Sequence, residues 1–299
     1  MHIPVLLHEV ITALEPKPGN FFIDGTLGGG GHAREIIKKI SPGGVFLGLD
    51  ADKHAIENAR RELESLGKEL GSDVFVRHGS YTEIQDIKKE KNLGKADGLL
   101  LDLGLSSNQL EESGRGFTFM KNEPLDMRYD ASDNRNNLTA EKIINGCAEE
   151  ELADIFWKYG EERKSRQMAK AIVTARKKKR IETTADLLEI IGERRNQKTR
   201  IHPATKVFMA LRIRVNSEFE HIESIMEQLP SIVKGKTAII SFHSLEDRLI
   251  KEGFKRIEKE GWGSIQTKKV IKPSYEEIRE NPKSRSAKLR VIQILSSRF

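Results

Sequence analysis

The sequence predicts an α/β fold, a mostly parallel sheet of seven strands with a helical domain inserted after the fourth strand. Three observations lead to this expectation. Short apolar runs alternate with amphipathic helical patterns up to residue 104 and again after residue 215. The run at residues 97–104 is apolar through its middle, as in a central strand buried on both faces. Residues 111–214 carry only helical patterns, so the two flanking segments should form one discontinuous domain.

The first strand leads into a glycine-rich turn. After a short amphipathic helical pattern at residues 7–14, residues 21–23 form an apolar run, and residues 24–32 then read Asp-Gly-Thr-Leu-Gly-Gly-Gly-Gly-His. A helical pattern follows directly. Because glycine accepts positive φ and leaves the backbone N–H groups of a helix start accessible, this turn is suited to cradle a cofactor.

Two classes of cofactor fit this turn. Residues 28–33 match the looser dinucleotide pattern G-x-G-x-x-A, so a nicotinamide-dependent oxidoreductase is one alternative. Asp24, which ends the first strand, would repel a pyrophosphate but could hold a cationic ammonium group. Asp50 ends the next strand, residues 45–50, where it could accept both hydroxyls of a ribose. Asp24 therefore favours S-adenosylmethionine.

Two later strand ends supply further candidates. The strand at residues 74–78 is followed by Tyr81, beyond the carboxyl end, where ligands of open sheets gather. Its ring could lie against an adenine or belong to the core. The central strand ends at Asp102, and an acid at that position lies where an open sheet places its chemistry.

The last strands identify the kind of sheet. A helix at residues 219–229, a strand at 237–242 and a helix at 249–257 continue the alternation. Two further strands are expected at 264–271 and 289–295, with no helix between them long enough for a parallel crossover, so they should be antiparallel. Seven strands with this ending are typical of Rossmann-like class I methyltransferases. We expect this domain to comprise residues 1–110 and 215–299.

The inserted helical domain, residues 111–214, holds most of the positive charge. The segment from Lys158 to Arg180 contains ten Lys or Arg and two acids, which gives a local charge of +8, compared with +6 for the whole chain. Such a concentration favours a polyanionic partner, although a solvated helix face is the simpler alternative. The loop at residues 113–119 contains a cation and two aromatics, which suits it to gripping a nucleic-acid backbone and stacking a base, or to acting as a lid.

Several classes of site and location are not expected. Cys147 is the single cysteine and the eight histidines are scattered, so we expect neither a disulfide framework nor a metal site. The N-terminus lacks a cationic lead, and no run of about 18 apolar residues occurs. We therefore expect a cytoplasmic protein without a membrane partner.

Six motifs resemble, in chain order, the bacterial 16S rRNA cytosine-N4 methyltransferase family known as RsmH and formerly as MraW. They are HIPVLL at 2–7, the glycine turn at 24–32, DLGLSS at 102–107, GRGF at 114–117, PLDMR at 124–128 and SFHSLEDR at 241–248. Together they span nearly the whole chain.

The resemblance implies methyl transfer from S-adenosylmethionine to the exocyclic N4 of a cytosine, cytosine 1402 in the decoding centre of 16S rRNA. The expected partner is this rRNA within the small ribosomal subunit, and the protein is expected as a monomer or homodimer. The resemblance assigns the cofactor to seven residues: Gly30, Gly31, His32, Asp50, Tyr81, Asp102 and Gln109. The glycine turn itself adds Asp24 and Gly28 as candidates.

The chemistry of a cytosine amine sets the remaining expectations. This amine is a poor nucleophile, so the enzyme must align it with the methyl group and accept its hydrogen bonds. Asp102 or a carbonyl of its loop is the leading acceptor, with Ser106 and His243 as weaker candidates. The base must be single-stranded or turned outward. The expected RNA contacts are Arg115, Phe117, Phe119, Lys164, Arg166, Lys170, Arg176, Lys177 and Lys178. A non-catalytic RNA-binding assembly factor is the second alternative.

Overall fold

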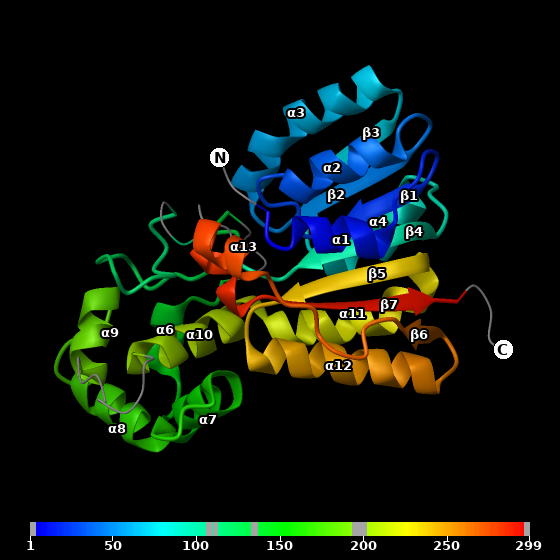
Figure 1. The fold of residues 1–299 in the computed structure, drawn as a ribbon. Helices are drawn as coiled ribbons and strands as arrows, with labels where there is room; N and C mark the ends of the chain where they lie inside the picture. The colour runs from blue at the N-terminus through cyan, green and yellow to red at the C-terminus, as the bar shows by residue number, and fades with distance from the viewer. Residues whose placement is uncertain (1–3, 106–109, 111–112, 133–136, 193–201, 296–299) are drawn as a thin grey trace. The chain divides into compact units, whose positions relative to one another are not determined.

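A computed structural model describes residues 4–105, 110, 113–132, 137–192 and 202–295. The chain divides into two compact units (Figure 1). One comprises Met1–Gly104 with Phe219–Phe299, and the other comprises Leu105–Glu218. In the described part of the chain, no helix is both long and apolar enough to cross a membrane.

The first unit is built on a seven-stranded sheet with the order β3-β2-β1-β4-β5-β7-β6. Its strands are β1 (Phe21–Asp24), β2 (Val45–Asp50), β3 (Asp73–His78), β4 (Ala96–Asp102), β5 (Val233–Ser241), β6 (Gly263–Ile265) and β7 (Lys288–Ile294). The first five strands are parallel, and β7 runs antiparallel to both neighbours. The predicted fold class is confirmed. Strands are added outward from β1 in one direction to β3 and in the other direction from β4, so the strand order reverses between β1 and β4. Ligands of open sheets bind at such a switch point.

Helices cover both faces of this sheet. The helices are α1 (Leu7–Leu14), α2 (Gly31–Ile40), α3 (Lys53–Leu70), α4 (Ile84–Glu90), α11 (Glu218–Ile232), α12 (Ser244–Lys259) and α13 (Tyr275–Glu280), with short 3-10 turns at Tyr81–Glu83 and Pro282–Ser286. Apolar residues of α1, α2 and α3 pack with one face of the sheet in a single core, and α11 and α12 lie on the other side of it (Figure 1). The middle of β4 is fully buried, as the apolar run predicted.

The end of the sheet differs in detail from the prediction. The strand expected at residues 264–271 is only three residues long, and Ile271 contributes an isolated antiparallel bridge to Leu289. The chain between β6 and β7 then forms α13, which has only six residues and was not predicted. A helix this short leaves no clear periodic pattern in a sequence.

The second unit is helical. It contains α6 (Ala140–Gly146), α7 (Glu149–Gly160), α8 (Ser165–Arg176), α9 (Thr184–Ile191) and α10 (Pro203–Asn216). These helices agree with the helical patterns expected for residues 111–214. α7 packs against both α8 and α10. The buried face of α8 includes Ala169 and Ile172, whereas Arg166 and Lys170 are exposed.

Candidate active site

Three carboxylates end neighbouring strands of the first unit. Asp24, Asp50 and Asp102 are the last residues of β1, β2 and β4, and β1 pairs with both of the other strands. Asp24 is 1% exposed, and the charges of both other carboxylates act on it. The structure therefore brings together the three acids that the sequence indicated.

The glycine turn is tied to these strand ends by its own backbone. The Gly28 N–H donates to Asp50 Oδ2 at 2.7 Å, and the Leu27 N–H donates to the Leu49 carbonyl at 2.8 Å. Gly28 and Gly30 have φ values of 50° and 73°, in the left-handed region that favours glycine. Gly30 lies immediately before α2, so the turn leads the chain into the N-terminus of a helix.

Burial shifts the protonation of both acids beside the turn. It raises the pKa of Asp24 to about 7, helped by the charges of Asp102 and Asp50 and opposed by the Thr26 N–H. It also raises the pKa of Asp50 to about 6, against the N–H groups of Asp52 and Gly28, which donate to the two carboxylate oxygens. A positive charge bound at this edge would favour the ionised form of both groups.

His32 uses its side chain within the protein. Nε2 lies 2.9 Å from the Val5 carbonyl oxygen, and burial lowers the pKa of the imidazole to about 4. The ring is therefore neutral and Nε2–H donates to Val5. This leaves the backbone N–H of His32, in the first turn of α2, as the group that could serve a cofactor.

Tyr81 lies next to the glycine turn. It opens the 3-10 turn that follows β3, and a Cβ placed on Gly25 would lie 2.8 Å from the Tyr81 Cβ. The ring is half-buried and meets His221 edge-on at 6.0 Å between centroids. The structure thus brings Tyr81 to the start of the turn.

The backbone around Asp102 is fixed from two sides. Its N–H donates to Thr26 Oγ1 at 2.6 Å, and the following Leu103 N–H donates to the Ile240 carbonyl at 3.0 Å. Gly104 packs closely on the Phe242 ring, where a Cβ would lie 2.6 Å away. Ser106 and Gln109, which the sequence analysis also named, lie outside the described residues.

His243 caps a helix. It is the N-cap of α12, and its Nδ1 accepts the Glu246 N–H at 3.3 Å. Its Nε2 lies 3.0 Å from Glu246 Oε1, close enough for an ion pair but without the alignment of a hydrogen bond. Glu246 Oε2 in turn accepts the Phe242 N–H at 2.9 Å. Both ring nitrogens therefore face Glu246, and Nδ1 caps the start of α12.

In the helical unit, the loop expected to grip RNA is held by its own side chains. The Arg115 guanidinium donates to the carbonyls of Arg128 and Tyr129 at 3.0 and 2.5 Å. Phe117 is 7% exposed and stacks on Tyr129 at 5.9 Å between centroids. This corrects the expectation that Phe117 stacks on a base, because its ring is covered. Phe119 is only half-buried and remains the aromatic candidate of this loop.

The basic segment, residues 158–180, contains exposed cations and cations whose side chains bind other groups of the protein. Arg176 donates to the carbonyls of Ile144 and Cys147 at 2.6 and 2.7 Å, which caps the end of α6. This corrects the prediction of Arg176 as an RNA contact. Lys179 and Arg180 form ion pairs with acids of the same unit. Six cations are exposed and have no ion pair among the described residues: Arg163, Lys164, Arg166, Lys170, Lys177 and Lys178.

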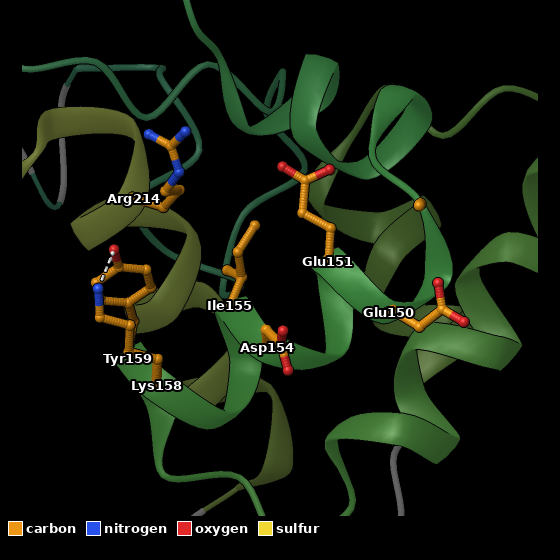
Figure 2. Close-up of a pocket in the computed structure, with 8 residues that line it drawn as sticks. Glu150, Glu151, Asp154, Ile155, Lys158, Tyr159 and Arg214 are labelled. Atoms are coloured by element: carbon orange, nitrogen blue, oxygen red, sulfur yellow. Dashed lines mark hydrogen bonds between the residues drawn. The ribbon is translucent and has the colours of Figure 1, made fainter.

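An open cleft of about 450 Å³ lies in the helical unit, between α7 and Arg214 of α10 (Figure 2). Its lining includes the carboxylates of Glu150, Glu151 and Asp154. These three acids outnumber the two cations of the described lining, Lys158 and Arg214, so the cleft does not favour a phosphate backbone, and only Lys158 of these two cations belongs to the basic segment. It is therefore separate from the candidate site.

Comparison with known proteins assigns the family. The model of the MraW methylase family matches residues 1–295. The chain is 46% identical over 294 residues to "Ribosomal RNA small subunit methyltransferase H" of Dictyoglomus thermophilum, covering 97% of this chain and 96% of that protein. It is 41% identical over 294 residues to the protein of the same name from Coprothermobacter proteolyticus, covering 98% and 95%.

Solved structures show weaker likenesses. A SAM-dependent O-methyltransferase from Thermotoga maritima aligns at 9% identity with a TM-score of 0.42, over 100% of this chain and 68% of that one. Fibrillarin from Aeropyrum pernix, with bound S-adenosyl-L-methionine, aligns at 11% identity with a TM-score of 0.37, over 95% and 74%. These values add nothing to an assignment that depends on the sequence matches. Because the family model spans nearly the whole chain, this protein belongs to the MraW methylase family and is a methyltransferase that uses S-adenosylmethionine.

Proposed function

We propose that this protein methylates the exocyclic N4 of a cytosine in small-subunit rRNA, cytosine 1402 of 16S rRNA. The relatives named above are small-subunit rRNA methyltransferases, and the N4 position is what the motif resemblance implies. The observation that carries the proposal is the meeting of Asp24, Asp50 and Asp102 beside the glycine turn at the switch point of the sheet.

The residues at this edge fit S-adenosylmethionine, which when bound supplies a methyl group on an electrophilic sulfonium. The buried Asp24 carboxyl would hold the ammonium group, because a cation offsets the cost of its ionised form. Asp50 would accept from the ribose hydroxyls with the lone pairs that its backbone contacts leave. Gly30, Gly31 and the N–H groups of the first turn of α2 would line the rest of the cradle.

Asp102 is the proposed acceptor for the substrate amine. It ends the central strand, and the hydrogen bonds of its N–H to Thr26 and of the Leu103 N–H to Ile240 hold the backbone in place. As N4 becomes tetrahedral, it needs an acceptor for its N–H and a group or a water to take its proton. A carboxylate in a fixed position can do both.

The helical unit would bind the RNA around the target. The six exposed cations of the basic segment, which have no ion pair in the described part of the chain, suit contacts with phosphates. The Phe119 ring stacks on His202 at 5.2 Å between centroids, and its half-buried side chain leaves part of the ring for a base. A base in a duplex is out of reach, so the cytosine must be unpaired or turned outward.

The test is methyl transfer from labelled S-adenosylmethionine to 16S rRNA, offered as free RNA and as assembled small subunits, followed by digestion to nucleosides. We expect label in N4-methylcytidine, and loss of most turnover in Asp102→Ala when the cofactor is saturating. Label in another nucleoside would exclude the N4 assignment. RNA binding without transfer from either form would favour the assembly factor, and preference for NAD would favour the oxidoreductase.

A further inference from the structure

The N-terminal segment Pro4–Leu6 lies against the glycine turn. A Cβ placed on Gly31 would lie 2.3 Å from Pro4 Cγ, so the proline ring fills the space that glycine leaves. The next residue along the turn, His32, donates from Nε2 to the Val5 carbonyl at 2.9 Å. Both contacts fall on the first two residues of α2, where the proposed cradle ends.

The same segment is anchored from the far end of the chain. The Leu6 N–H donates to Glu277 Oε1 at 2.7 Å, across 271 positions of sequence, and Figure 1 shows α13 beside the start of α1. Leu6 is fully buried and has a φ of 54°, which is rare for a residue other than glycine. Its carbonyl accepts the Val10 N–H at 2.9 Å and so begins α1.

We infer that Glu277 is a positioning residue for the cofactor, because it holds Pro4–Leu6 as a strap across the first turn of α2. This inference rests on the assignment of S-adenosylmethionine to the glycine turn proposed above. Terminal segments fray unless they are tied down, and a frayed strap would leave Gly31 and His32 without their packing partners. The N–H groups of the cradle would then lose their fixed directions.

The test compares three variants of the full-length protein. Glu277→Ala removes the acceptor, Glu277→Gln keeps an Oε1 that can accept the Leu6 N–H, and Glu276→Ala changes an exposed neighbour on α13 as the matched control. Affinity for S-adenosylmethionine is measured by titration calorimetry. Amide hydrogen exchange of residues 5–12 and 31–36 is measured without cofactor, so this readout does not depend on activity.

We expect Glu277→Ala to weaken cofactor binding about tenfold, as for one lost hydrogen bond to a charged group. Exchange should accelerate in both segments, and the KM for the cofactor should rise while kcat at saturation stays unchanged. Glu277→Gln should remain within about threefold of the wild type, and Glu276→Ala should match it.

Faster exchange with wild-type affinity would overturn the inference, and so would unchanged exchange. If Glu277→Ala does not fold, Pro4→Ala provides the same comparison at the other contact, with the same expected loss of affinity and the same refutation if affinity is unchanged. Asp50→Asn is titrated alongside. Wild-type affinity in that variant would show that the cofactor assignment itself is wrong, whatever Glu277 does.

Discussion

Asp24 is the residue on which the electrostatics of the site depend. It is buried, and burial together with the neighbouring carboxylates raises its pKa to about 7. Its folded pKa lies above the unfolded value, so the folded protein binds more protons than the unfolded chain between about pH 4 and 7. Without a ligand, Asp24 therefore destabilises the fold progressively as pH rises through this window. A bound cation would remove that penalty.

Cofactor binding should therefore release a proton from Asp24. Below pH 7 the free protein holds this proton, and a bound ammonium group favours the carboxylate, so affinity should rise towards pH 7 by up to about tenfold per pH unit and then level off. Calorimetry in two buffers of different ionisation enthalpy counts the protons released. In Asp24→Asn, the step near pH 7 should be lost and the step near pH 6 from Asp50 should remain.

The ligand's own amine titrates equally with both proteins, so the difference between them isolates Asp24. An identical pH dependence in the wild type and in Asp24→Asn would contradict the prediction.

Helix ends decide the roles of several charged and polar residues at the scale of the element. His243 with Glu246 forms the N-terminal cap of α12, and Arg176 satisfies carbonyls at the end of α6. The last carbonyls of a helix lack partners within it, so a buried end needs such donors. The basic run predicted an RNA contact at Arg176. Its capping role could not be predicted, because the helix that Arg176 caps is too short to be visible in the sequence.

Arg176→Ala should destabilise the helical unit rather than weaken RNA binding directly. Two hydrogen bonds from a charged donor are lost, so we expect the free energy of unfolding to fall by about 1–3 kcal/mol. Lys177→Ala, the exposed neighbour, should change it by less than about 0.5 kcal/mol. Chemical denaturation checks both values. Equal stability of Arg176→Ala and the wild type, with weaker RNA binding, would restore the original assignment.

At the scale of the whole molecule, the distribution of charge matters more than its sum. The chain has a net charge of +6, but the six exposed cations at 163–178, which form no ion pair with any described residue, belong to the helical unit. A second row of exposed lysines, Lys251, Lys255 and Lys259, lies at i, i+4 spacing along α12. If RNA were held only by general electrostatic attraction, both groups of cations would contribute equally to its binding. If the basic segment is a phosphate-binding surface, only the first group should contribute.

RNA affinity should fall with salt at a slope of about −4 on a double logarithmic plot, for six phosphate contacts with single-stranded RNA. Replacing Lys170, Lys177 and Lys178 with Ala should reduce the slope to about −2. The same replacement at Lys251, Lys255 and Lys259 changes net charge equally and should leave the slope unchanged. Filter binding or anisotropy across a salt series measures it. A wild-type slope near zero, or equal effects of the two triple variants, would exclude the phosphate-binding role of the basic segment.

Local patterns in the sequence determined the sheet, its antiparallel ending, the glycine turn and the three acids at strand ends. Periodicity and turn chemistry are properties of neighbouring residues, so they can be seen before any tertiary contact forms. The covered ring of Phe117, the cap made by Arg176 and the pairing of Glu277 with Leu6 were decided only by the tertiary structure. Each depends on a partner whose distance along the chain no local pattern encodes, since burial and hydrogen-bond satisfaction are settled when distant segments pack together.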